Sequence, residues 1–107
     1  MKTGIIGCGN IGTELALFID KTKGFELKYL CDVNSNNIEK LQEKLRNSTK
    51  DVGIEQLIKN SELIIESANK NVVGKILKNK NLDKTGKKLL IMSTGGIIEN
   101  INLFNKI

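Results

Sequence analysis

The stretch Gly7-Cys8-Gly9-Asn10-Ile11-Gly12 decides the fold of this chain, because it reads G-x-G-x-x-G between two segments of different pattern. The residues before it, Lys2 to Ile6, end in an apolar pair and predict a short strand. The residues after it, Asn10 to Lys21, predict an amphipathic helix. The apolar residues at helical spacing in that segment are Ile11, Leu15, Phe18 and Ile19. A glycine-rich turn from a strand into a helix is typical of a phosphate-binding loop.

Each glycine of this turn has a mechanical task. Gly7 permits the sharp turn out of the strand, and Gly12 lets the helix pack close to the sheet. Gly9 has no side chain, so a pyrophosphate can approach its backbone. The free amides of Asn10 and Ile11 then point, with the helix dipole, at the phosphates. The turn therefore predicts a dinucleotide site at the start of the helix.

An acidic residue follows the second predicted strand. This strand covers Phe25 to Cys31, and Asp32 stands directly after it, 20 positions beyond Gly12. At that spacing a carboxylate binds the ribose hydroxyls of NAD and repels the 2′-phosphate of NADP. Asn34 and Ser35 are neutral donors, so NADP stays an alternative. A simpler role for Asp32, as a helix cap or a surface acid, also stays open.

Helices and strands alternate along the rest of the chain. Further helices are predicted at 38–47, 54–60, 71–79 and 97–107, and further strands at 51–53, 61–67 and 88–92. In the second strand, simple alternation places Leu27, Tyr29 and Cys31 on one face. The pattern predicts one α/β domain over residues 1–107, with a doubly wound parallel sheet of about five strands in the order 3-2-1-4-5. Ligands of such sheets bind at the carboxyl ends of the strands, where the order reverses.

Two further loops fall at this predicted crevice. Ser67-Ala68-Asn69 follows the fourth strand, and Ser93-Thr94-Gly95-Gly96 follows the fifth. Their small residues let a ligand lie against the backbone, although ordinary turn chemistry explains them as well. Glu66 either has a functional role or closes its strand. The candidate cofactor-binding residues are Gly7, Gly9, Asn10, Ile11, Gly12, Asp32, Asn34, Ala68, Asn69, Ser93, Thr94 and Gly95.

The charge of the chain favours a solvated lysine surface. The 17 basic and 12 acidic residues give a net charge of +5, and Arg46 is the only arginine. The lysines alternate with glutamates and asparagines, without an interleaved aromatic set. We therefore expect no nucleic-acid partner, while polyanion binding by the lysines remains an alternative.

The cysteines and the hydropathy pattern exclude other classes of protein. Cys8 and Cys31 lack CxxC spacing, and the absence of histidine excludes a Cys–His dyad and leaves no zinc site. Small apolar fillers in a reducing compartment explain the two thiols, with an oxidative disulfide as the alternative. No run approaches the roughly 20 apolar residues of a membrane span. We expect a cytoplasmic protein without a membrane partner.

Four segments together resemble the N-terminal cofactor domain of archaeal and bacterial L-aspartate dehydrogenases, and homoserine dehydrogenases have a similar domain. These segments are 7–12, 31–32, 65–69 and 90–96. The "E-S-A-N" and "M-S-T-G-G" stretches are similar to the family's "E-A-A" and "M-S-x-G-A". The resemblance implies a Rossmann-like fold and an NAD(P)-dependent transfer of hydride from Cα of L-aspartate, which leaves an imine that water converts to oxaloacetate and ammonia. It also implies that Ala68, Asn69 and the Ser93–Gly95 loop border the nicotinamide side.

The chain departs from this family in one respect. Family members continue into a second α/β region that binds the substrate and supplies a catalytic histidine, whereas these 107 residues contain no histidine. We therefore predict no catalytic residue here and no turnover by this chain alone. Two interpretations follow: the cofactor half of an amino-acid dehydrogenase, or a stand-alone nucleotide-binding or sensor module. S-adenosylmethionine as the ligand and a homo-oligomer that covers an apolar sheet face both stay open.

Overall fold

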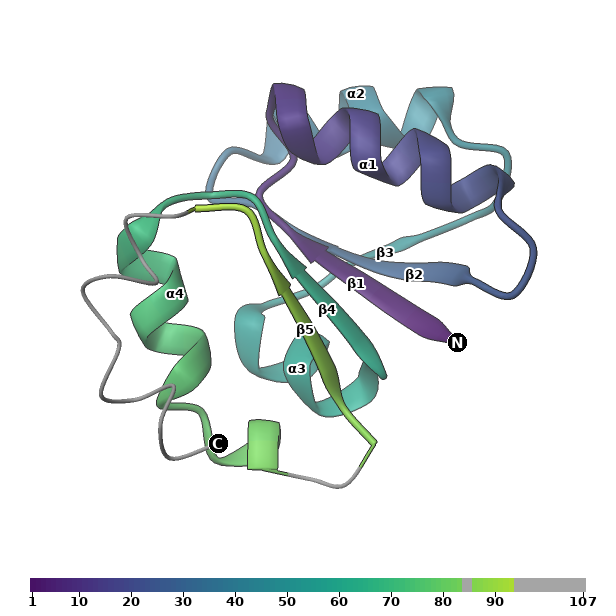
Figure 1. Ribbon diagram of the computed structural model, residues 1–107. Helices are drawn as coiled ribbons and strands as arrows, with labels where there is room; N and C mark the ends of the chain where they lie inside the picture. Colours follow the sequence, from purple (N-terminus) through teal and green to yellow (C-terminus); the bar gives the residue numbers. More distant parts are fainter. Residues whose placement is uncertain (84–85, 94–107) are drawn as a thin grey trace.

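The computed structural model of the protein describes residues 1–83 and 86–93. Its elements alternate along the chain as predicted (Figure 1). They are β1 (Lys2–Ile6), α1 (Asn10–Lys21), β2 (Glu26–Cys31), α2 (Ser35–Lys44), β3 (Lys50–Asp51), α3 (Ile54–Asn60), β4 (Leu63–Glu66), α4 (Lys70–Leu77), the 3₁₀ turn η1 (Lys80–Asp83) and β5 (Lys88–Ile91). The helix predicted at 97–107 lies outside the described residues.

The five strands form one parallel sheet in the order β3-β2-β1-β4-β5, which confirms the predicted topology. Helices α1 and α2 cover one face, while α3 and α4 cover the other (Figure 1). Each face has its own buried apolar cluster, one around Ile5 and Leu30 and the other around Ile6 and Leu57. The strand order reverses between β1 and β4, so the crevice of such a sheet opens at the carboxyl ends of these two parallel strands.

The side chains of β2 do not alternate between the two faces of the sheet in the simple way that was predicted. Thr3 pairs with Leu27, but the next residue of β1, Gly4, pairs with Tyr29, so the register slips by one residue at Lys28. Leu27 consequently packs in the α1–α2 cluster, whereas Tyr29 and Cys31 pack on the opposite face. The prediction of one shared face was wrong because a β-bulge adds a residue and reverses the alternation.

Helix α1 presents a different stripe from the predicted one. The residues it buries are Gly12, Ala16 and Ile19, and Leu15 is half-buried against the same cluster. Ile11 and Phe18 are 57% and 68% exposed, so their predicted inward position was wrong. The close approach of Gly12 to Gly7 O and Ser67 Oγ fixes the rotation of the helix, and the small Ala16 occupies the buried face that larger apolar residues were expected to fill.

The starts of two helices are set by asparagine caps. The Asn34 side chain accepts from Asn36 N, so α2 begins at Ser35, earlier than predicted. The Asn69 side chain accepts from Val72 N and starts α4. Asparagine at such positions satisfies amides that the helix itself leaves free.

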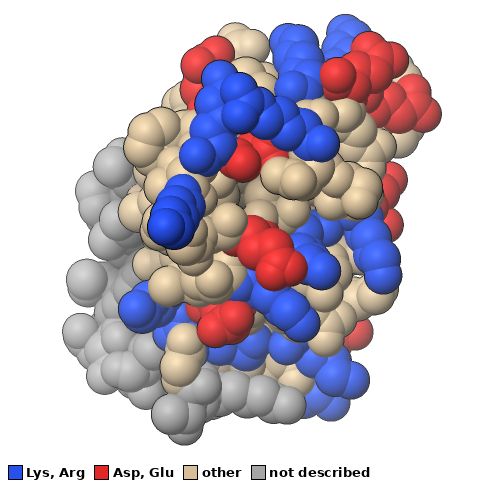
Figure 2. Space-filling view, turned by 90° about the vertical axis from the view of Figure 1, so that its right-hand side faces the viewer, with Lys and Arg blue, Asp and Glu red and all other residues tan. Residues whose placement is uncertain are grey.

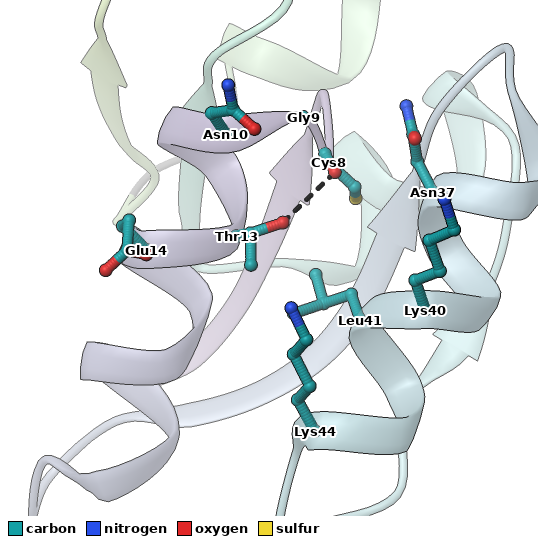
Figure 3. Close-up of a pocket in the computed structure, with 9 residues that line it drawn as sticks. All are labelled: Cys8, Gly9, Asn10, Thr13, Glu14, Asn37, Lys40, Leu41 and Lys44. Atoms are coloured by element: carbon teal, nitrogen blue, oxygen red, sulfur yellow. Dashed lines mark hydrogen bonds between the residues drawn. The ribbon is translucent and has the colours of Figure 1, made fainter.

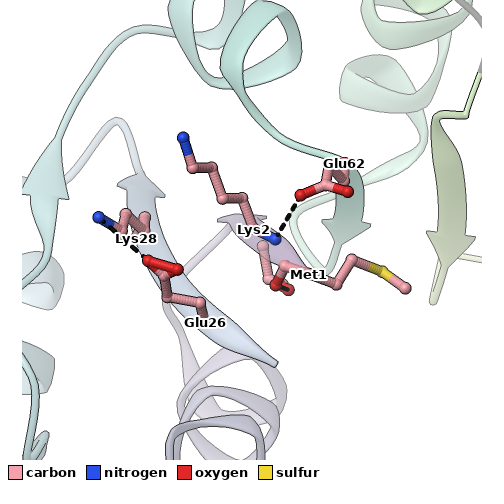
Figure 4. Close-up of polar contacts among 6 residues, drawn as sticks. Met1, Lys2, Glu26, Lys28 and Glu62 are labelled. Carbon is pink, nitrogen blue, oxygen red and sulfur yellow. Dashed lines mark hydrogen bonds and ion pairs between the residues drawn. The ribbon is translucent and has the colours of Figure 1, made fainter. Parts of the chain in front are cut away.

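At the amino ends of the strands, polar contacts join neighbouring segments (Figure 4). Lys2 N donates to Glu62 Oε1 over 3.0 Å, and within β2 an exposed ion pair of 3.1 Å joins Lys28 to Glu26. The Lys87 ammonium donates to the carbonyls of Ile58 and Ser61 at the carboxyl end of α3. A positive charge there interacts favourably with the helix dipole. None of the helices in the described part of the chain has the length and apolar content needed to cross a membrane.

Candidate functional site

Two glycines of the loop after β1 are required by the packing of the protein itself. Gly7 has a φ of +96°, and a Cβ there would lie 2.6 Å from Ala68 N. A Cβ on Gly12 would lie 1.9 Å from Gly7 O and 2.7 Å from Ser67 Oγ. These contacts are far below van der Waals distance. The start of α1 is therefore pressed against the loops that follow β1 and β4.

Gly9 differs from both, because nothing in the protein requires a glycine there. Its φ is −77°, and a Cβ would have no atom within 4 Å. Gly9 is the N-cap of α1, but it supplies no side chain to cap the helix. Within the described residues, the amides of Asn10, Ile11 and Gly12 donate no hydrogen bond. The site therefore offers open space above three free donors at the positive end of a helix, which is the arrangement that binds phosphates.

Asp32 lies beside this loop and is held by three donors. Its Oδ2 accepts from Cys8 N at 2.7 Å and from Asn37 Nδ2 at 3.2 Å, and its Oδ1 accepts from Asn34 N at 2.8 Å. Partial burial acts to raise the pKa of Asp32, but the amides of Asn34 and Cys8 and the Asn37 side chain outweigh it and hold the pKa below its ordinary value. The carboxylate therefore stays charged at neutral pH, next to the glycine loop.

A pocket of about 290 Å³ joins these features at the carboxyl ends of the strands. It is lined by Ile6, Gly7, Gly9, Cys31, Asp32, Val33, Asn37, Ile54, Ser67, Ala68, Asn69 and Val72. Five of the predicted residues meet there: Gly7, Gly9, Asp32, Ala68 and Asn69. Its aliphatic members include Ile6 of β1, Ile54 of α3 and Val72 of α4, so the pocket combines an apolar lining with a charged acceptor. Ligand pockets commonly have this composition.

A second pocket, of about 330 Å³, lies between α1 and α2 on the other side of the glycine loop (Figure 3). Asn10 lines it, as do Lys40 and Lys44 of α2. Gly9 and Asn37 line both pockets, so the two hollows adjoin each other at the glycine loop. Glu14 of α1 also lines this pocket, so its lining carries two lysines and one carboxylate beside the glycine loop.

The other predicted residues have more local roles. Asn34 caps α2 with its side chain and donates to Asp32 with its amide, and the Ile11 side chain faces solvent. Ser93 lies next to the end of β4 and contacts Glu66. Thr94 and Gly95 lie outside the described residues.

The list of candidate cofactor-binding residues omitted two residues that hold the site together, although the sequence placed the loop of Ser67 at the crevice. Asn37 donates to Asp32, and Ser67 Oγ donates to Gly7 O at 2.6 Å, which ties the loop after β4 to the glycine loop. A signal for Asn37 existed, because a side chain in the first turn of α2 faces the end of β2. Nothing in the sequence pointed to the Ser67 contact, since its partner lies 60 residues away.

The two thiols are unpaired, and their surroundings favour the protonated form. Burial, with the nearby charge of Asp32, raises the pKa of Cys8 to about 12, and burial also raises the pKa of Cys31. The Cys8 thiol donates weakly to Cys31 O at 3.8 Å, and both cysteines are free. Within residues 1–83 and 86–93, no group of three His, Cys, Asp or Glu side chains is arranged to hold a metal ion.

Acidic residues lie between the lysines on the surface. Figure 2, which views the right-hand side of Figure 1, shows acidic side chains interspersed among the lysines of that face. A polyanion meeting this face would encounter both signs of charge. The view therefore gives the polyanion alternative no continuous basic patch.

Comparison with curated proteins finds relatives named L-aspartate dehydrogenase. The chain is 35% identical over 101 residues to the L-aspartate dehydrogenase of Methanosarcina acetivorans, and 28% identical over 102 residues to that of Nitrosopumilus maritimus. Each match covers 92% of this chain and 36% of the relative. The chain thus spans about a third of the length of these relatives.

Solved structures and a family model agree on the kind of domain. The myo-inositol dehydrogenase of Lactobacillus casei, solved with NAD(H) and myo-inositol, matches the whole chain and 34% of its own length, with a TM-score of 0.79 at 15% identity. A probable dehydrogenase of Thermotoga maritima matches 99% of the chain and 33% of its own length, with a TM-score of 0.75 at 20% identity. At such identities the likeness concerns the fold alone. The family model described as "Homoserine dehydrogenase, NAD binding domain" matches residues 7–107. The chain therefore belongs to the family of homoserine dehydrogenase-type NAD-binding domains.

Proposed function

We propose that this chain binds NAD as the cofactor domain of an amino-acid oxidoreductase of the L-aspartate dehydrogenase type. The observation that carries the proposal is the open amino end of α1 at Gly9, beside the charged Asp32. The pyrophosphate lies over Gly9, where the amides of Asn10 and Ile11 donate to it. Ala68 and Asn69 border the other side of the same pocket.

Asp32 selects the cofactor in this proposal. A carboxylate has about four acceptor positions, and three are occupied by protein donors, so one remains for a ribose hydroxyl. Its negative charge opposes a 2′-phosphate, which favours NAD. Lys40 and Lys44 lie across the neighbouring pocket and lessen this repulsion, so we expect weak NADP binding rather than none.

The substrate class rests on the relatives. Bound NAD supplies a hydride acceptor, and the curated relatives named L-aspartate dehydrogenase support oxidation of an amino acid at Cα. Residues 1–107 contain no histidine to move a proton, and they match about a third of those relatives. We therefore propose that they form the single cofactor domain, and that they bind NAD without oxidising L-aspartate on their own.

Calorimetric titration of the purified chain with NAD, NADP and S-adenosylmethionine tests this proposal. We expect NAD to bind more tightly than NADP, and S-adenosylmethionine not to bind. Gly9→Val should abolish NAD binding, because the side chain fills the phosphate position. Gly53→Val is the matched control: Gly53 is also an N-cap with a negative φ and free space around a Cβ, but it does not line the pocket. A folded chain that binds no dinucleotide, or equal losses in both variants, would contradict the proposal.

A further inference from the structure

Glu66, the last residue of β4, is a buried carboxylate at the edge of the crevice. It is 0% exposed, and its side-chain hydrogen bonds within the described residues all go to the two loops that leave β4 and β5. Oε2 accepts from Ala68 N at 2.8 Å and from Ser93 Oγ at 2.7 Å, while Oε1 accepts from Ser93 N at 3.1 Å. One side chain thus joins two loops that are 25 residues apart in the sequence.

The donors determine which side chain fits at this position. Ala68 N and Ser93 N are backbone amides, which can only donate, and each is bound by a different oxygen of Glu66. Only a group with two acceptor atoms satisfies both amides at once. Glutamine has the same shape, but its NH₂ group would face one of the amides and set two donors against each other. The structure therefore calls for a carboxylate rather than for any polar residue of this size.

A buried carboxylate is costly where packing is the only requirement. Transfer of an ionised group out of water is unfavourable unless hydrogen bonds or an opposite charge compensate it. In the described part of the chain no lysine or arginine forms an ion pair with Glu66, so its three neutral donors carry the compensation. The neighbours Ile64 and Ile65 show that this strand buries apolar side chains readily. The end of a buried strand would accept an apolar residue at lower cost, which indicates a role in placing the loops.

We infer that Glu66 is a positioning residue that fixes the backbone at Ala68 and Ser93 along the nicotinamide side of the cofactor crevice. This inference rests on the proposed function. In the sheet order, Asp32 directly follows β2 on one side of the glycine loop, whereas Glu66 ends β4 on the other side. A dinucleotide that spans this crevice places its adenosine half near Asp32 and its other half near the loops that Glu66 joins.

The two halves of the cofactor can therefore be tested separately. ADP-ribose keeps the adenosine and the pyrophosphate of NAD but lacks the nicotinamide ring. Glu66→Gln disturbs the loops after β4 and β5 and leaves the contacts of Asp32 in place. We expect the variant to lower NAD affinity by about tenfold, the effect of one unsatisfied buried donor, and to change ADP-ribose affinity by less than about twofold.

The matched control is Ser93→Ala, which removes one hydroxyl donor and leaves both amide contacts of Glu66 intact. We expect it to lower NAD affinity less than Glu66→Gln does. Equal losses of NAD and ADP-ribose in Glu66→Gln, or no loss of either, overturn the positioning role alone. A parent chain that binds neither ligand overturns the proposed function on which the role depends.

Hydrogen exchange keeps the inference testable where Glu66→Gln does not fold. In the ligand-free parent chain, the amides of Ala68 and Ser93 should exchange slowly, because Glu66 binds both before any cofactor arrives. Ala68 is itself an exposed residue, so slow exchange of its amide has to come from this contact. Exchange at the rate of free peptide amides overturns the inference, and slow exchange supports it.

Discussion

Helices α1 and α4 both begin at the same crevice, but their first turns are satisfied in different ways. At α4, the N-cap Asn69 binds Val72 N with its side chain at 3.1 Å. At α1, the N-cap Gly9 has no side chain that could accept from an amide of the first turn, and a Cβ there would have no atom within 4 Å. A protein that can cap one helix at this edge leaves the other uncapped, although a cap contributes about 1 kcal/mol to stability. Gly53 likewise leaves α3 without a side-chain cap but does not line the pocket, so the missing cap indicates a ligand at α1 because Gly9 lies in the pocket beside Asp32.

The largest expected effect comes from giving α1 the kind of cap that α4 has. Gly9→Asp places a capping carboxylate where the extended backbone of Gly9 accepts any residue. We expect the free energy of unfolding to stay equal or to rise by a few tenths of a kcal/mol. NAD affinity should fall by at least about a hundredfold, because the added charge lies at the phosphate position. Urea unfolding followed by circular dichroism and calorimetric titration measure the two quantities.

The control for this experiment is Gly12→Ala in the same loop. A Cβ at Gly12 would overlap Gly7 O, so this variant should lose stability as well as binding. If Gly9→Asp instead destabilises the fold as much as Gly12→Ala does, Gly9 is structural and the comparison between α1 and α4 fails.

A smaller effect is expected from Asp32, which borders the open end of α1. Asp32→Ala removes the acceptor for the ribose hydroxyls and the charge that opposes a 2′-phosphate. We expect NAD affinity to fall by about tenfold to a hundredfold, and NADP affinity to fall less. Titration of the parent and the variant with both cofactors gives this ratio. An equal loss for NAD and NADP would remove the ribose role from Asp32.

Removing the side-chain cap of α4 should change the stability of the fold more than NAD affinity. Asn69→Ala deletes the side-chain acceptor of α4 and should lower the free energy of unfolding by about 1 kcal/mol. Asn34→Ala deletes the corresponding cap of α2 and serves as the matched variant, with a loss of similar size. Urea unfolding of both variants checks this. A large loss of NAD affinity in Asn69→Ala with unchanged stability would show that this side chain serves the ligand and not the helix.

The difference between the two helices explains how far the sequence could predict the molecule. The order of the strands and the position of the glycine loop follow from local patterns, namely apolar periodicity and glycine spacing. The orientation of Ile11 and Phe18 does not, because it depends on the contact of Gly12 with Gly7 O, which exists only once the loops are packed. The bulge at Lys28 depends likewise on pairing between two strands.

The residues of the candidate site also fall into those that local patterns predict and those that they do not. Gly9 and Asp32 could be predicted, because their spacing along the chain reflects a local strand–turn–helix unit. The contacts of Glu66 could not, since they join loops that meet only in the folded sheet. Long-range hydrogen bonds leave no periodic trace in a single sequence. The residues that line a crevice are thus easier to predict than the residues that hold its walls in place.

The smallest expected effect is on the pH dependence of stability. It tests whether the donors around Asp32 favour its charged form. The pKa of Asp32 is lower in the folded protein than in the unfolded chain, despite the opposing effect of burial. Its contribution to stability is therefore present above the unfolded pKa, and it is lost as pH falls below about 4 through the folded pKa. Asp32→Asn should be less stable than the parent at neutral pH, and the gap should close in acid. The pKa of Asp20 is also lowered, so both the parent and the variant lose some stability in acid. Only the difference between their free energies of unfolding reports on Asp32. Urea unfolding of both proteins between about pH 7 and pH 3 gives that difference, and a constant gap across this range would show that the amides of Cys8 and Asn34 do not favour the charged form.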